Sequence, residues 1–97
     1  MDLAIVAKIK DVWPVLTALG VMHLDIFGSF ARGQQGPDSD LDVLVETLGA
    51  PTLGQLLDVQ DCLTKAVGRR VDVLTPGAIA RRPRLRAHVA AEAYRVA

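Results

Sequence analysis

Apolar residues recur along this chain at two different spacings, which predict different secondary structures. In the first twenty residues they follow the period of an amphipathic helix, which predicts one helix or a pair of short helices. Pro14 should interrupt this segment and Gly20 should end it. The helical period returns over 53–67, with Thr52 as the expected N-cap and Gly68 as the end. The chain should therefore begin with helices and carry a longer helix near its middle.

Three short segments are predicted to be β-strands. Turn-forming residues bound them, above all over 33–39 and at Thr75-Pro76-Gly77. After the third strand the pattern is helical again over most of 78–96, and Pro83 should open the last helix. These elements predict an α/β (α+β) fold in which a short mixed sheet is flanked by helices. The predicted strands are His23–Phe27, Leu41–Glu46 and Arg70–Leu74.

The second predicted strand carries acids on one of its faces. Successive strand side chains alternate, so Asp40 and Asp42 should lie together on one face, while Leu41, Val43 and Val45 lie on the other. A third acid, Asp72, stands between two valines of the third strand. Acids are disfavoured in such positions, and burying an unpaired charge is costly. Three carboxylates placed in this way need a cation.

Size and composition narrow the class of protein. With 97 residues the chain can form one compact domain, which we expect to span 1–97. No apolar run approaches the roughly 18 to 20 residues that cross a bilayer, and the polar N-terminal region does not resemble a signal peptide. We therefore expect a cytoplasmic protein without membrane association. The single Cys62 excludes an internal disulfide and a cysteine-based metal site.

The net charge is zero but unevenly distributed. Residues 1–49 contain three Lys or Arg and seven acids, whereas residues 50–97 contain eight and four. Solvated helix faces can produce such an asymmetry. A cation site in the first half, combined with an anion or partner surface in the second, can produce it as well. A basic run in the second half lacks interleaved aromatic residues, which argues against direct nucleic-acid binding and leaves a solvated face or a docking or phosphate-contacting patch. This run consists of Arg81, Arg82, Arg84 and Arg86.

The residues Gly28-Ser29-Phe30-Ala31-Arg32-Gly33, followed by Asp40-Leu41-Asp42, resemble the motif of the minimal nucleotidyltransferases. This family is a branch of the DNA polymerase β-like superfamily, and its pattern is Gly-Ser, ten residues, then Asp-x-Asp, with a third acid on a later strand. Asp72 matches that third acid. The resemblance spans nearly the whole chain and implies the nucleotidyltransferase fold.

The resemblance also implies a role for each motif residue. Gly28 would let the backbone approach the phosphates of a nucleoside triphosphate, and Ser29, as the cap of a short helix, would contact them. Asp40 and Asp42 would hold Mg²⁺, and Asp72 would complete a site for two ions and act as the general base. For Arg32 two alternatives remain: contact with the triphosphate, or an ion pair with a surface acid.

Substrate and partner follow from the same resemblance. The reaction implied is transfer of AMP from ATP to an acceptor hydroxyl, and the acceptor implied is a tyrosine of a HEPN-domain ribonuclease toxin for which this chain is the antitoxin. The chain has no acceptor-binding domain, which fits a partner that brings the hydroxyl. The alternative is a binding module that neutralises its partner by occlusion and keeps the nucleotide site idle or regulatory.

Two other motifs that share some of these residues are excluded. A P-loop fails because Gln34-Gln35 stands where Lys and Ser or Thr are required. An EF-hand fails because Val43 occupies the position that needs glycine. Asp38 is assigned to an Asx turn rather than to the acid site. His23 and His88, on different predicted elements, are expected on surfaces or helix faces.

Overall fold

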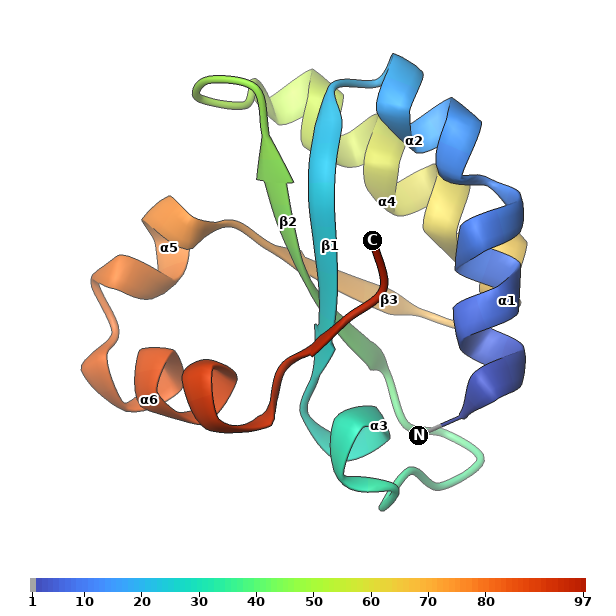
Figure 1. Ribbon diagram of the computed structural model, residues 1–97, viewed down its shortest axis with the longest axis vertical. Coiled ribbons are helices and arrows are strands. Elements are labelled where there is room, and N and C mark those ends of the chain that lie inside the picture. The colour runs from blue at the N-terminus through green and yellow to red at the C-terminus, as the bar shows by residue number, and fades with distance from the viewer. Residues whose placement is uncertain (1) are drawn as a thin grey trace.

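The computed structural model describes residues 2–97 (Figure 1). Its strands form one mixed sheet in the order β3-β2-β1-β4, in which β1 is antiparallel to β2 and β4, and β2 is parallel to β3. The predicted α/β class is confirmed. No helix within these residues combines the length and the apolar character that a membrane span requires. The elements are α1 (Leu3–Asp11), α2 (Trp13–Ala18), β1 (Val21–Phe27), α3 (Ser29–Arg32), β2 (Leu41–Thr47), α4 (Leu53–Val67), β3 (Val71–Leu74), α5 (Pro76–Ala80), α6 (Pro83–Glu92) and β4 (Tyr94–Arg95).

Helices α1, α2 and α4 cover one face of the sheet, as Figure 1 shows. Pro14 lies in the first turn of α2, so the predicted break between the first two helices is confirmed. Thr52 caps α4 in a reciprocal capping box with Gln55, and Gly68 ends that helix with a positive φ. The main core lies between these helices and the sheet; its fully buried members are Ile9, Leu16, Leu24, Ile26, Phe30, Leu41, Val43, Val45, Val59, Leu63 and Val71.

The opposite face of the sheet is only partly covered. Helices α5 and α6 pack there around a smaller apolar cluster of Phe27, Leu44, Ile79 and Val89. The alternation predicted for β2 is confirmed, because Leu44 faces this cluster while its neighbours on either side face the main core. Asp42 shares the face of Leu44 and remains half-buried. The fold therefore places the predicted acids on the sheet face that has less cover.

Two predicted segments differ in the structure. Thr75-Pro76-Gly77 is the start of α5 rather than a turn, because the Thr75 hydroxyl accepts from the Ala78 amide at 3.2 Å and proline occupies the first turn.

The last helix ends at Glu92, and the residues predicted to continue it form the edge strand β4 instead. The Val96 amide donates to the Leu24 carbonyl at 2.9 Å, and the Leu24 amide donates to the Ala97 carbonyl at 3.0 Å. The physical reason is the free edge of β1, whose backbone groups need partners.

Candidate active site

The three predicted acids are brought to one region by the pairing of β2 and β3. The two strands run parallel, and Asp42 and Asp72 are direct register partners. Asp40 immediately precedes β2. Its carboxylate lies 3.8 Å from Nε of Arg70, and the same nitrogen lies 4.0 Å from the Asp72 carboxylate. The sheet thus gathers acids that are far apart in the sequence.

The charges of these acids are poorly compensated within the chain. Burial, then the negative charges of Asp72 and Asp40, raise the pKa of Asp42 above its ordinary value, and Arg32 only partly offsets this. Arg70 reaches Asp40 and Asp72 at the limit of an ion pair, with a side chain that is 75% exposed. Such a pair contributes little in water.

A divalent cation suits this donor set, because Mg²⁺ prefers carboxylate oxygens and binds through one or two of them together with substrate phosphates. Within residues 2–97 no three metal-ligating side chains already stand close enough to enclose an ion. The chemistry of these carboxylates fits Mg²⁺, although among the described residues they do not yet enclose an ion.

Gly28 lies directly against the carboxylate of Asp42. Its φ of 74° and ψ of −149° are accessible to glycine and strained for other residues. A Cβ at this position would collide with Oδ2 of Asp42. The neighbouring Phe27 is the register partner of Asp42, which fixes this approach. Gly28, which directly follows β1, therefore forms a row with Asp42 on β2 and Asp72 on β3.

Ser29 does not cap α3 as predicted. Gly28 is the N-cap residue, and Ser29 occupies the first helical position without a side-chain capping bond. The boundary moves by one residue because the positive φ that turns the chain belongs to Gly28. The Ser29 hydroxyl is consequently not committed to capping.

Arg32 forms the surface ion pair that the sequence left as one of two alternatives. Its Nη1 donates to Oε2 of Glu92 at 2.8 Å, and its Nε donates to Gln34 at 3.0 Å. These bonds tie α3 to the end of α6. The guanidinium still acts on the acids, because its charge lowers the pKa of Asp42.

A hollow of about 530 Å³ opens beside two of the acids, and we call it the Asp72 hollow. Its walls come from β3, from the first half of α4 and from the start of α6. The lining residues are Phe27, Asp42, Leu53, Leu56, Leu57, Gln60, Asp72, Val73, Leu74, Arg82 and Leu85.

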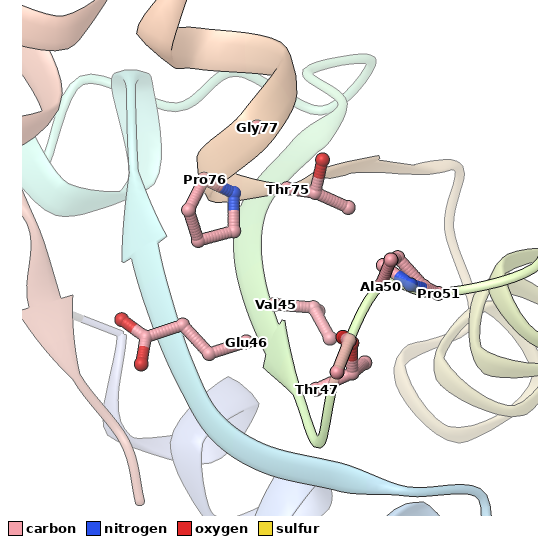
Figure 2. Close-up of a pocket in the computed structure, with 9 residues that line it drawn as sticks. Val45, Glu46, Thr47, Ala50, Pro51, Thr75, Pro76 and Gly77 are labelled. Carbon is pink, nitrogen blue, oxygen red and sulfur yellow. The ribbon is translucent and has the colours of Figure 1, made fainter.

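A second hollow, of about 550 Å³, lies between the 47–51 loop and Thr75-Pro76-Gly77 (Figure 2). None of the three acids lines it. Its one acid, Glu46, points away from Ala50 and Pro51 in Figure 2 and instead contacts Arg95. Of these two hollows, the Asp72 hollow is the one that two of the acids, Asp42 and Asp72, line.

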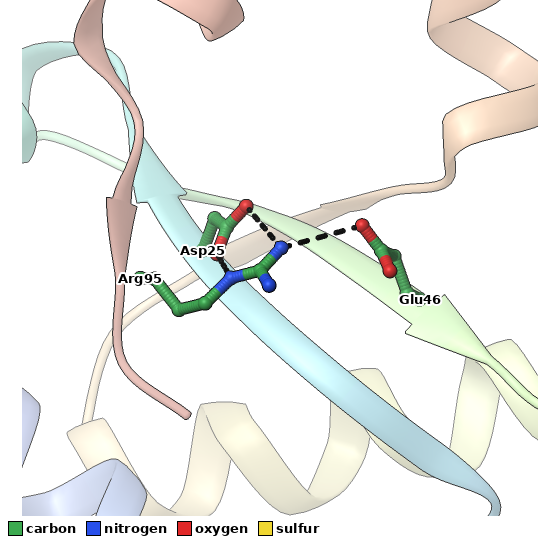
Figure 3. A network of polar contacts seen from close by, with 3 residues as sticks. All are labelled: Asp25, Glu46 and Arg95. Carbon is green, nitrogen blue, oxygen red and sulfur yellow. Dashed lines mark hydrogen bonds and ion pairs between the residues drawn. The ribbon is translucent and has the colours of Figure 1, made fainter.

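The sequence interpretation missed an ion-pair network on the same sheet face (Figure 3). Asp25 on β1 is 9% exposed, and Arg95 on β4 donates to it from Nε at 2.9 Å. A second nitrogen of Arg95 lies 3.5 Å from Glu46 on β2. No local signal could reveal this network, because Arg95 was predicted to be helical and its partners lie in distant segments.

Arg69 is a second residue that the interpretation missed. Its Nη1 donates to the Ser39 carbonyl at 2.9 Å, and its guanidinium lies 4.8 Å from the centre of the Phe30 ring. Phe30 is fully buried directly after Ser29, and Ser39 directly precedes Asp40. Arg69 therefore links the two halves of the motif. Its position beside Gly68, at the entrance to the strand of Asp72, was the available signal.

Comparison with known proteins agrees with this arrangement. Residues 5–95 match the model of the nucleotidyltransferase domain family. The chain belongs to this family. Over 70 residues it is 39% identical to a protein of Methanocaldococcus jannaschii named "Putative protein adenylyltransferase MJ0435", a match that covers 72% of this chain and 75% of that protein. It is also 31% identical over 74 residues to protein adenylyltransferase MntA of Thermococcus cleftensis, covering 68% and 75% of the two chains.

Solved structures extend the likeness to three dimensions. A structure described as a "putative minimal nucleotidyltransferase" aligns with a TM-score of 0.76 and 34% identity, covering 91% of this chain and 88% of the other. A toxin-antitoxin crystal structure with AMP-PNP aligns with a TM-score of 0.67 over 97% of this chain and 70% of the other, and at 20% identity it supports the fold alone. The expected nucleotidyltransferase fold is confirmed. The family match and the named relatives also show the class of activity, which is nucleotidyl transfer.

Proposed function

We propose that this nucleotidyltransferase moves AMP from ATP to a hydroxyl group of a partner protein, with Asp40, Asp42 and Asp72 as the residues that hold Mg²⁺. The row formed by Gly28, Asp42 and Asp72 carries the proposal. It juxtaposes a backbone turn that can approach phosphates with acids that lack sufficient positive charge. Two Mg²⁺ ions, when bound, would neutralise charge on the phosphates and make the attacking hydroxyl more acidic.

The reaction is an in-line displacement at the α-phosphorus. The acceptor oxygen forms a bond to that phosphorus, the bond to the bridging oxygen of the leaving group breaks, and pyrophosphate departs. We assign the proton of the acceptor hydroxyl to Asp72, which lines the open hollow beside Asp42. Positioning and charge neutralisation provide most of the acceleration in phosphoryl-group transfer.

Contacts with the triphosphate are assigned to the other side of Asp42. Gly28 presents backbone without a side chain, and the Ser29 hydroxyl makes no capping bond. Arg32 adds positive charge near Asp42 while Glu92 holds its guanidinium. These three residues surround the region where the leaving pyrophosphate would gather negative charge.

As the partner we propose a HEPN-domain ribonuclease toxin, with a tyrosine as the acceptor and this chain as the antitoxin. Two structural neighbours are toxin-antitoxin complexes, of which one contains AMP-PNP and the other is an MntA-HpeT mutant. A relative in sequence carries the name protein adenylyltransferase MntA.

The test is transfer of label from α-labelled ATP to the purified partner toxin, read by mass spectrometry at the tyrosine. Asp42→Asn should abolish transfer, whereas Asp38→Asn, a matched loss of an exposed acid just outside the motif, should not. Replacing the partner tyrosine by phenylalanine should also abolish it.

Neutralisation of the toxin in cells separates modification from occlusion. If Asp42→Asn protects cells as well as the unmodified chain does, the antitoxin acts by occlusion and the proposed modification is not the means of protection. Label transfer that persists in Asp42→Asn would contradict the assignment of the site.

A further inference from the structure

Four arginines near the start of α6 have no acidic partner among residues 2–97. They are Arg81, Arg82, Arg84 and Arg86, which we call the α6 arginines, and all four are exposed. Other arginines of the chain, such as Arg32 and Arg95, do form ion pairs. Like charges this close in sequence repel one another, so folding does not explain their concentration.

One of these arginines, Arg82, lines the Asp72 hollow from one side. The other three lie within four residues of it in the sequence. On the other side of the hollow, α4 contributes Leu53 and Leu57, which are 73% and 55% exposed. Large aliphatic side chains exposed at the rim of a hollow mark a surface that another molecule covers. The rim thus carries two exposed leucines on one side and the exposed Arg82 on the other.

The hollow lies on the acceptor side of the acids. In-line displacement requires the attacking and leaving oxygens to lie on opposite sides of the phosphorus. Gly28 and Ser29, assigned to the phosphates, do not line the hollow, whereas Asp72, assigned to the acceptor proton, does. The incoming hydroxyl therefore approaches through this opening.

We propose that the Asp72 hollow and the α6 arginines together dock the acceptor as a polypeptide segment in which acidic residues flank a tyrosine. This inference rests on the proposed function. The leucines suit an aromatic ring, and the arginines suit carboxylates through charge-assisted hydrogen bonds. Opposite charge on the two partners also speeds association and selects against basic segments. A small-molecule acceptor would use neither the exposed leucines nor the arginines beyond the hollow.

Binding of three fluorescent peptides to the nucleotide-free protein tests the charge and the partner class. The peptides have equal length and carry tyrosine between glutamates, tyrosine between lysines, or phenylalanine between glutamates. The two glutamate peptides should bind at least about tenfold more tightly than the lysine peptide at low salt, and the difference should shrink as salt rises. Equal affinities would overturn the proposal. A single-stranded oligonucleotide of the same length that binds more tightly than the glutamate peptides would also overturn it, in favour of a nucleic-acid surface.

Matched charge reversals locate the surface. Arg82→Glu combined with Arg84→Glu should weaken binding of the glutamate peptides at least about tenfold. Lys8→Glu combined with Lys10→Glu changes the net charge equally on exposed positions of α1, across the sheet, and should leave binding unchanged. If both double variants weaken binding equally, net charge and not this surface is responsible, and the proposal is wrong.

Label transfer to the same peptides separates this inference from the proposed function. The tyrosine-glutamate peptide should be modified with the higher kcat/KM, and the arginine reversal should raise KM more than it lowers kcat. Transfer to both tyrosine peptides with equal kcat/KM would contradict the docking surface but not the activity. Absence of transfer, with the predicted difference in affinity intact, would contradict peptide adenylylation while leaving the docking surface standing.

Discussion

Two groups of acids share one face of the sheet, and the chain compensates their charges differently. Asp25 is buried, and Arg95 donates to it at 2.9 Å while also approaching Glu46. Among residues 2–97, Asp40 and Asp72 form ion pairs only with the exposed Arg70, at 3.8 and 4.0 Å. Arg95 compensates the negative charges of Asp25 and Glu46, whereas the charges of Asp40 and Asp72 are compensated only weakly.

This difference separates a structural role from a chemical one. The Arg95 pair joins β4 to β1 and to β2, so it fixes the last strand of the sheet (Figure 3). An equally tight internal arginine at Asp42 would occupy the position that the proposed function assigns to a cation and phosphates. Acids whose charge remains uncompensated are costly to the fold, and such groups concentrate at functional sites.

The largest effect that the comparison predicts is at Asp42. Asp42→Asn should lower label transfer at least about 1,000-fold, because a lost metal ligand removes several kcal/mol of transition-state stabilisation. The same variant should melt at a higher temperature than the unmodified chain without metal, because it removes a repelled, half-buried charge. Calorimetry of both proteins in a chelator measures the second effect. A lower melting temperature would show that Asp42 stabilises the fold and would erase the distinction between the two groups.

The pH dependence of that stability difference follows from the raised pKa of Asp42. Its ionised form is disfavoured in the folded state, so its contribution to stability is fully present below the unfolded pKa and is lost as pH rises through the higher folded pKa. The advantage of Asp42→Asn should therefore be small at about pH 4, near the unfolded pKa of an aspartate, and should grow as the pH rises above it. Melting temperatures of both proteins across this range, without metal, provide the measurement. An advantage that shrinks with rising pH would contradict the assigned direction of the shift.

The next largest effect is expected at the ion pair of Asp25 and Arg95. Arg95→Met should lower the melting temperature by about 5 to 10 °C, because Asp25 then stays buried without its partner. Transfer per folded molecule should stay unchanged. Arg84→Met, which removes an exposed arginine without an ion pair among residues 2–97, should leave the melting temperature nearly unchanged. Equal losses in the two variants would mean that the pair does not stabilise β4.

These two groups also show what the sequence could and could not reveal. The acids at Asp40, Asp42 and Asp72 were predictable because strand alternation and a fixed interval to Gly28 are local patterns. The Asp25 pair was not, because its partner lies on a two-residue strand that exists only through hydrogen bonds to β1. The apolar residues before β4 recur at helical spacing, and the pairing of β4 with β1 overrides this helical preference.

Arg69 offers a smaller and more specific effect. Arg69→Met should weaken Mn²⁺ binding about tenfold, because residues that orient metal ligands contribute about 10- to 100-fold in affinity. The reason is the loss of the bond to the Ser39 carbonyl and of the cation over the Phe30 ring, which together hold Asp40 near the Gly28 turn. Titration of Mn²⁺ followed by electron paramagnetic resonance measures the affinity. Arg69→Lys should recover part of it, since an ammonium can stack on the ring but lacks the planar fork. A change in melting temperature alone, with Mn²⁺ affinity intact, would reduce Arg69 to a structural residue.

The smallest effect, and the one with opposite sign, is expected at the neighbouring Arg70. Its guanidinium lies near Asp40 and Asp72, so it competes with any cation that those acids bind. Arg70→Met should therefore strengthen Mn²⁺ binding, by about two- to fivefold, since an ion pair this exposed is weak. The gain should vanish at high salt, where the competing charge is screened. The same titration checks both arginines, and weaker Mn²⁺ binding in Arg70→Met would mean that Arg70 orients the acids as Arg69 does. The sign of the change in Mn²⁺ affinity therefore shows whether Arg70 competes with a bound cation or holds Asp40 and Asp72 in position.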